Sequence, residues 1–174
     1  MILNNQLFNI FMCIILLSVF NSANAVTTSN RVTVTARFTA PPCTLTMPDR
    51  VNLGAILPGA QSYPPFIIRL DCPLPAAITA LYAEIVQGSL SAGSNNRVDM
   101  TGPAGSSGTP VKLWLTDNDG KEVMLDGSGS SEESGRFCSG TGSRNCTITP
   151  NTEVEIDTPR GLTSAMLRFN VIVP

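Results

Sequence analysis

Apolar and polar side chains alternate along residues 31–39, the most regular pattern in the chain. One face of this stretch carries Val32, Val34, Ala36 and Phe38, and the other carries Arg31, Thr33, Thr35, Arg37 and Thr39. A period of two residues predicts a β-strand that buries one of its faces. Because the strand lies ahead of Cys43, the first cysteine after the leader, it can pair with its own sheet or complete the sheet of another molecule.

Short apolar runs separated by Gly, Pro, Asn and Ser fill the rest of the chain. They predict strands over residues 44–53, 65–71, 78–86, 111–116, 122–125, 153–157 and 165–173. Residues 117–120 (Asp-Asn-Asp-Gly) predict a hairpin turn, and the helix candidate at 76–84 is too rich in β-formers to assign. Residues 88–110 and 126–143 are dense in Gly and Ser and are expected to form rim loops. The fold class predicted is therefore an all-β sandwich.

Residues 1–25 have the features of a cleaved signal peptide. They carry no charged side chain, hold an apolar stretch over 7–20 and end in Ala23-Asn24-Ala25, which fits a cleavage site. The apolar stretch is too short for a membrane span of ~20 residues. No Lys or Arg precedes it, which departs from the usual leader. We expect an exported mature chain of residues 26–174.

The charged residues show no pattern typical of nucleic-acid binding or catalysis. Eleven Lys and Arg oppose 13 Asp and Glu, for a net charge of −2, and no basic cluster occurs, so nucleic acid is not an expected partner. The chain has no histidine, which excludes Ser–His and Cys–His nucleophile pairs and imidazole metal ligands. The Asp117–Gly120 turn is similar to the start of a calcium loop, but position twelve is Ser128 instead of Glu. We expect no enzyme activity, no cofactor and no metal site.

Four cysteines remain once Cys13 leaves with the leader: Cys43, Cys72, Cys138 and Cys146. An even number in an exported protein predicts two disulfides. Three pairings are possible, of which Cys43–Cys72 and Cys138–Cys146 are the local ones. Loop entropy gives these two about 3.6 and about 2.6 kcal/mol.

Several motifs in order resemble the pilin subunits of chaperone–usher fimbriae, closest to the minor or adaptor subunits of type 1-like fimbriae. The segment from Val32 to Cys43 is similar to the family's N-terminal extension and first cysteine. Val51-Asn52-Leu53-Gly54 and then Leu70-Asp71-Cys72 follow in the family's order. Residues 169–174 look like the last pilin strand, and Gly161 stands where the chaperone-binding motif has its glycine.

The resemblance implies an incomplete immunoglobulin-like β-sandwich with an N-terminal donor strand. The implied organisation is a signal peptide at 1–25, a donor-strand extension at 26–40 and a pilin domain at 41–174. A periplasmic chaperone would first fill the groove left by the missing strand. At the outer-membrane usher, the extension of a neighbouring pilin subunit would then replace it by strand addition. The function implied is a structural subunit of an adhesive fimbrium, exported through the periplasm to the bacterial cell surface.

The resemblance also implies roles for individual residues. Val32, Val34, Ala36 and Phe38 would enter a neighbour's groove. Gly161, Leu167, Phe169, Val171 and Val173 would form the strand that binds the chaperone and lines the groove. Two positions depart from the family pattern: Ala36 replaces a common glycine, and Val173 replaces a common penultimate tyrosine.

Two alternatives stay open beside this hypothesis. The 31–39 strand could be the edge strand of a complete sandwich. The subunit could itself act as an adhesin, binding host glycan or protein through rim loops 88–110 and 126–146. Trp114 lies between Leu113 and Leu115 and is expected in the sandwich core rather than on a sugar-binding face.

Overall fold

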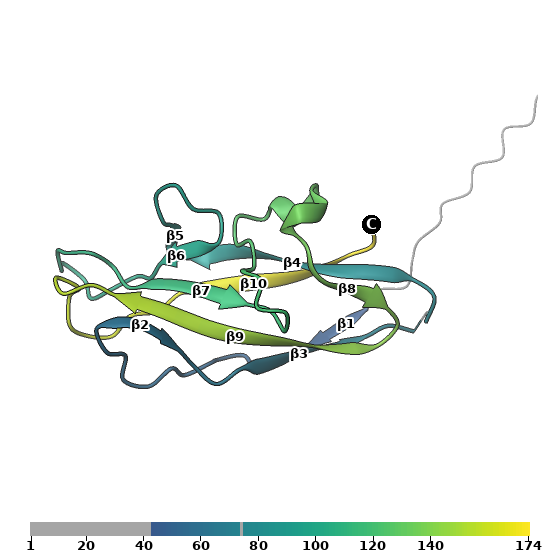
Figure 1. Cartoon of the computed structure of the whole chain (residues 1–174), viewed down its shortest axis with the longest axis horizontal. Helices are drawn as coiled ribbons and strands as arrows, with labels where there is room; N and C mark the ends of the chain where they lie inside the picture. Colours follow the sequence, from purple (N-terminus) through teal and green to yellow (C-terminus); the bar gives the residue numbers. More distant parts are fainter. Residues whose placement is uncertain (1–42, 74) are drawn as a thin grey trace, which may run out of the picture. The chain divides into compact units, whose positions relative to one another are not determined.

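Strands form nearly all the regular structure in the described residues, 43–73 and 75–174 of a computed structural model (Figure 1). The larger sheet has the order β1-β3-β9-β7-β6-β5, with β2 also paired to β9, and every pair is antiparallel. Its strands are β1 (Thr44–Thr46), β2 (Gly59–Ser62), β3 (Phe66–Asp71), β5 (Ser89–Leu90), β6 (Arg97–Asp99), β7 (Lys112–Thr116) and β9 (Arg144–Val154).

The smaller sheet has three strands in the order β10-β4-β8, which places the last strand of the chain at its edge. These strands are β10 (Met166–Ile172), β4 (Ile78–Gln87) and β8 (Phe137–Thr141). Two short 3₁₀ turns, η2 (Ser128–Ser130) and η3 (Glu133–Gly135), connect toward β8. Gly129 of η2 packs closely on β4, because a Cβ at this glycine would lie 2.4 Å from the Cβ of Tyr82.

The core lies between the two sheets and is built from alternate strand residues, as a half-buried strand requires. Fully buried side chains include Ile68 and Leu70 from β3, Leu81 from β4, Ile148 from β9, and Leu125. The predicted all-β sandwich is confirmed.

The strand boundaries differ from the prediction in several regions, and residues 122–125, where a strand was predicted, form only an isolated bridge between Glu122 and Thr116. The predicted strand at 44–53 pairs only over β1, because the chain leaves the β3 ladder after Thr46. The predicted strand at 153–157 is the end of the much longer β9, which starts at Arg144. The expected loops also contain strands, namely β5 and β6 in 88–110 and β8 in 126–143. The ambiguous segment 76–84 belongs to β4.

The expectation that Trp114 lies in the core is wrong. Its neighbours in β7, Leu113 and Leu115, are buried, so the alternation turns Trp114 outward. The Arg97 guanidinium stacks 4.4 Å from the ring centroid, and ion pairs with Glu122 and Glu153 at 3.3 and 3.4 Å hold it there. The stacked guanidinium covers one face of the Trp114 ring, so this aromatic side chain can lie on the outer face of the sheet.

Candidate functional site

Strand β10 pairs with β4 along one of its edges. It pairs with β4 over its whole length, with Leu167 opposite Ile85, Phe169 opposite Ala83 and Val171 opposite Leu81. Among residues 43–73 and 75–174, no strand pairs with the other edge of β10. A free edge presents unpaired N–H and C=O groups to any further strand.

The segment between β1 and β2 faces this free edge across the core. Residues 47–58 carry no strand assignment, although β1 precedes them and β2 follows. Met47 packs on the main core, and Leu53 and Ile56 pack on a second cluster around Met100, Val111 and Leu113. The segment is thus attached to the core by side chains rather than by a backbone ladder.

A groove of about 1060 Å³ lies between this segment and β10. Its apolar lining comes from both sheets and includes Met47, Leu53, Ile56, Phe66, Met100, Leu113, Leu115, Ala165, Leu167 and Phe169. Asp49, Arg50 and Asn52 add polar groups. A long apolar groove that runs beside an open strand edge suits an extended peptide with alternate apolar side chains.

Phe169 joins the two sheets within the groove. Its ring centroid lies 6.4 Å from that of Phe66 on β3 and 6.2 Å from that of Phe137 on β8. The interplanar angles of 67° and 76° are edge-to-face arrangements, which aromatic rings prefer. Phe169 is nevertheless only half-buried, since the side toward the groove has no neighbouring strand.

The residues proposed from the sequence for the groove strand fall into two groups. Leu167, Phe169 and Val171 lie in β10 and pack against the main core. Gly161 and Val173 lie outside β10, on either side of it, and Val173 is 50% exposed. The proposed donor residues Val32, Val34, Ala36 and Phe38 lie outside the described residues. The 47–58 wall and the Met100 side of the groove were not predicted from the sequence.

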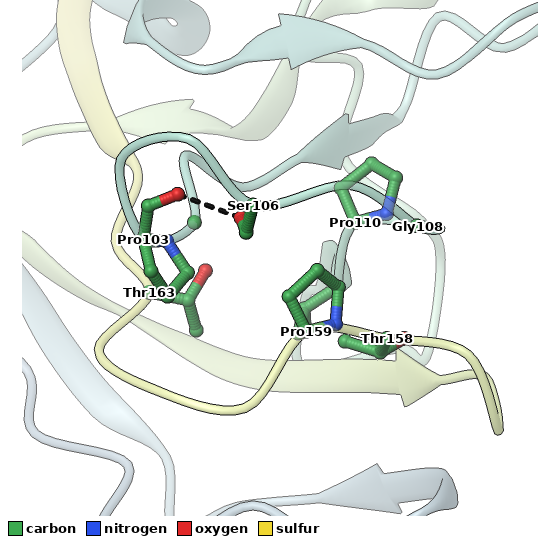
Figure 2. Close-up of a pocket in the computed structure, with 9 residues that line it drawn as sticks. Pro103, Ser106, Gly108, Pro110, Thr158, Pro159 and Thr163 are labelled. Carbon is green, nitrogen blue, oxygen red and sulfur yellow. Dashed lines mark hydrogen bonds between the residues drawn. The ribbon is translucent and has the colours of Figure 1, made fainter.

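Gly161 approaches Pro103 closely beside the groove. Its φ of +142° is unfavourable for other residues, and a Cβ there would lie 2.6 Å from Cγ of Pro103. Gly161 lines the groove, and Thr163 lines both the groove and a smaller cavity of about 220 Å³. Figure 2 shows this cavity, where Pro103, Pro110 and Pro159 surround a space between two loops.

The loops at this end are joined by several hydrogen bonds. Thr101 and Ser164 exchange two backbone bonds, at 2.8 and 3.0 Å. The amide and hydroxyl of Thr109 both donate to Oδ2 of Asp157, at 3.2 and 2.9 Å. The bond from the Thr109 hydroxyl lowers the pKa of the Asp157 carboxyl. These contacts fix the loop that leads into β10.

The structure joins Cys43 to Cys72 and Cys138 to Cys146. The first bond ties the start of β1 to the end of β3, with a Cα–Cα distance of 4.4 Å. The second spans only eight residues and connects β8 with β9. Together they cross-link both sides of the sandwich at the same end, where β3 ends and β9 begins.

Arg144 reinforces the end of the sandwich where this second disulfide lies. Its guanidinium donates to the carbonyl of Cys138 from Nε and Nη2, to Oγ1 and the carbonyl of Thr79, and to the carbonyl of Gly142. Burial lowers the pKa of Arg144, yet an arginine stays protonated in proteins. Its role is to satisfy carbonyls where β4, β8 and β9 meet.

Neither a metal-binding cluster nor a membrane-spanning helix occurs in the described residues. No group of three or more His, Cys, Asp or Glu that could hold a metal ion occurs among them. No helix in the same residues is long and apolar enough to cross a membrane.

Comparisons with known proteins identify the fold. The P pilus rod subunit PapA matches with a TM-score of 0.56 and 18% identity, over 77% of this chain and all (100%) of that one. The chain has the fold of a chaperone–usher pilus subunit. A second match, from a chaperone–usher pilus structure concerned with rod uncoiling, has a TM-score of 0.54 and 16% identity, covering 84% of this chain and 96% of that one. No protein-family model and no curated protein sequence matches.

Within this pilus-subunit fold, the groove marks the position where a strand beyond β10 would complete the smaller sheet. The predicted incomplete immunoglobulin-like sandwich agrees with the fold of the matching subunits. Both sequence identities lie below 20%, so these matches establish the fold alone. The proposed function therefore depends on the groove.

Proposed function

We propose that this chain is a structural subunit of an adhesive chaperone–usher fimbrium and polymerises by donor-strand exchange. The observation that carries the proposal is the open groove of about 1060 Å³ beside the free edge of β10. The occupant is residues 26–40 of the following subunit. Its Val32, Val34, Ala36 and Phe38 enter the groove while its backbone pairs with β10.

The energetics of strand addition suit a permanent fibre. Burying one Val or Phe side chain contributes ~1.5–3 kcal/mol, so three large plugs contribute roughly 5–9 kcal/mol before the ladder is counted. The ladder adds backbone hydrogen bonds along β10, which has seven residues. Ala36 contributes the least, since its side chain is a single methyl.

Until that strand arrives, the groove exposes apolar surface that promotes aggregation. A periplasmic chaperone that lends a strand to β10 covers this surface, and the outer-membrane usher is where the exchange takes place. The proposed location is therefore the periplasm during assembly and the cell-surface fimbrium afterwards. The similarity in fold to pilus rod subunits and the features of residues 1–25 support this route.

The test is deletion of residues 26–40 from the chain in an exporting cell that produces its chaperone and usher. The truncated subunit should still bind the chaperone, because β10 and the groove remain. It should no longer attach to the preceding subunit, because it has no strand to donate. Normal fibre assembly by the truncated subunit would show that the donor-strand assignment is wrong.

A pair of adjacent substitutions makes the test specific to one face of the strand. Val34→Asp places a charge in the groove and should prevent exchange. Thr35→Asp places the same charge on the opposite face, and we expect exchange close to the wild-type rate. Equal losses in both variants would contradict the alternation on which the donor assignment depends.

Ala36 gives a further, finer test. Where the resemblance implies a glycine, the extra methyl is expected to limit which grooves accept this strand. Ala36→Gly should raise the rate of strand exchange with candidate neighbours or widen their range. Unchanged rates and partners would remove the restriction.

The place of the subunit in the fibre is proposed to be that of a minor or adaptor component. The number of copies per fibre, counted by quantitative immunogold labelling, tests this point. One or a few copies at a fixed position would support it, and continuous labelling along the shaft would identify a rod subunit instead.

A further inference from the structure

Two ends of the sandwich expose large apolar side chains. At the end where β9 stops and the chain turns toward β10, Leu57 is 59% exposed, Ile156 is 100% exposed, and Leu162, which also lines the groove, is 88% exposed. Leu57 and Ile156 each lie two residues beyond Gly59 and Val154, the last pair of the β2–β9 ladder. Exposed side chains of this size gathered at one end are typical of a contact surface. We call this end, built from residues 57, 101–110 and 155–163, the proline end after the cavity in Figure 2.

The opposite end carries a second apolar surface. The connection from β3 to β4 includes Pro73, Pro75 and Ala76, all exposed, and leads into Ile78, which is 60% exposed. Cys43 lies at this same end, because its disulfide joins it to Cys72. We call this the cysteine end. Figure 1 shows the β3–β4 connection and the loop between β9 and β10 at opposite ends of the strands.

These positions fix the direction in which subunits can follow one another. The segment that a subunit donates must leave from the cysteine end, where Cys43 is held. A head-to-tail contact uses two different surfaces and extends indefinitely if the copies do not close into a ring. If the donor enters the groove at the proline end, its own domain lies beyond that end, and successive domains continue in line. The reverse direction would place the incoming domain at the cysteine end, where the acceptor's own segment leaves.

We propose that the cysteine end of one copy packs on the proline end of the copy that accepts its strand. This inference rests on the proposed function and adds a second, domain-to-domain contact to the strand in the groove. Ile78 and the prolines of the β3–β4 connection would lie against Ile156 and Leu162. The cavity of about 220 Å³ between Pro103, Pro110 and Pro159 offers space for one apolar side chain of the incoming copy.

The contact is small, so its effect is on geometry rather than on affinity. The strand in the groove holds the subunits together, and the apolar ends restrict the angle between consecutive domains. The proline end is suited to this role because its loops are fixed: Thr109 is bonded to Asp157, and Thr101 is bonded to Ser164. Loss of the contact should leave fibres intact but more flexible.

Cysteine cross-linking in fibres of the full chain tests the contact. The variant with both Ile156→Cys and Ile78→Cys should give a ladder of dimers and higher multimers under mild oxidation. Each single variant should give none, because the contact joins two different surfaces. The control combines Ile156→Cys with Ile67→Cys, since Ile67 is 51% exposed on β3 and lies away from both ends. Peptide mapping should show the native disulfides retained.

A charge pair provides an independent measurement. Ile156→Lys should lower the persistence length of the fibre in electron micrographs without reducing the number of fibres. Adding Ile78→Glu should restore the stiffness, since the two charges would then face each other across the contact.

The outcomes separate this contact from the proposed function. Fibres that assemble normally but give no cross-link, with stiffness unchanged by Ile156→Lys, would overturn the end contact and leave strand exchange intact. Cross-linked dimers from a single variant would also overturn it, since they require a symmetric contact. A wild-type chain that forms no fibre with its chaperone and usher would overturn the proposed function and this inference together.

Discussion

The substitution Phe169→Ala tests how much a donor strand from another molecule adds to the stabilising effect of Phe169 in the groove. In the chain alone, the substitution removes two edge-to-face contacts, with Phe66 and Phe137, worth ~1–3 kcal/mol together beyond the area they bury. Because Phe169 is half-buried, we expect a loss of about 2–3 kcal/mol in the free energy of unfolding, below the range of about 3–5 kcal/mol for a fully buried Phe. A donor strand covers the remaining side of the ring, so the loss should rise toward the full value.

The difference between these two losses is the quantity that tests the reasoning. Guanidinium unfolding of the full chain, with and without a saturating peptide of residues 26–40, gives both values. An extra loss of about 1–2 kcal/mol with peptide corresponds to about 5–30-fold weaker strand binding. Val86→Ala is the control, because Val86 is 46% exposed on β4 and outside the groove, so its small loss should not depend on the peptide. An equal loss for Phe169→Ala in both conditions would refute the claim that the donor covers this ring.

Three further substitutions test the framework around the groove. Gly161→Ala should lower stability by about 1–3 kcal/mol in thermal unfolding, because its φ is +142° and its Cβ would lie 2.6 Å from a proline ring carbon. The control Gly102→Ala, whose Cβ would meet only a serine oxygen at 3.7 Å, should cost less than half as much. Arg144→Met should cost about 2–4 kcal/mol, because five hydrogen bonds to three residues are lost, and an unchanged melting temperature would contradict this role. For Asp157, the folded-state pKa is lowered by Thr109, so its contribution to stability is present at neutral pH and is lost as the pH falls below the unfolded-state value. Thr109→Val should remove this part of the acid dependence, measured as the difference in unfolding midpoint between neutral and acidic pH.

The sequence predicted the strands whose buried faces are apolar. Residues 165–173 and 78–86 alternate clearly, and the structure places β10 and β4 within about one residue of these limits. Residues 111–116 gave β7 in the same way, although the outward direction of Trp114 was missed. The error came from residue type, since Trp was assumed to be buried. The alternation with Leu113 and Leu115 already indicated the opposite face.

Residues 144–152 of β9 could not be recognised from their pattern. Its inward positions include Pro150 and Thr152 in place of large aliphatic residues, and a proline in a central strand argues against a strand. The structure tolerates Pro150 because β9 changes partner there: β3 pairs up to Ile148, and β2 pairs from Asn151 onward. This exchange of partners is a tertiary property, and local sequence carries little sign of it.

The groove itself was predicted only through the resemblance, and its second wall shows why periodicity could not find it. Residues 44–53 were expected to form one strand, yet the ladder ends at Thr46. Pro48 follows two residues later and cannot donate a backbone hydrogen bond. A wall made of unpaired backbone resembles a strand in its sequence. Only its position opposite β10 shows that a partner is missing.

The attachment of this wall explains how the groove stays open without a strand to fill it. At one end, the Cys43–Cys72 disulfide holds β1, a strand of only three residues, against β3. At the other end, β2 pairs with β9 from Gly59 onward. Between these anchors, among the described backbone contacts, residues 47–58 make only the local bond from the Gly54 amide to Asn52 Oδ1. The wall is therefore held at both ends, and between them its backbone N–H and C=O groups have no ladder partner. An incoming strand can pair with backbone groups on both sides of the groove without first breaking a ladder. Reduction of Cys43–Cys72 should for this reason weaken strand binding more than the loss of an equally stabilising contact elsewhere in the sandwich.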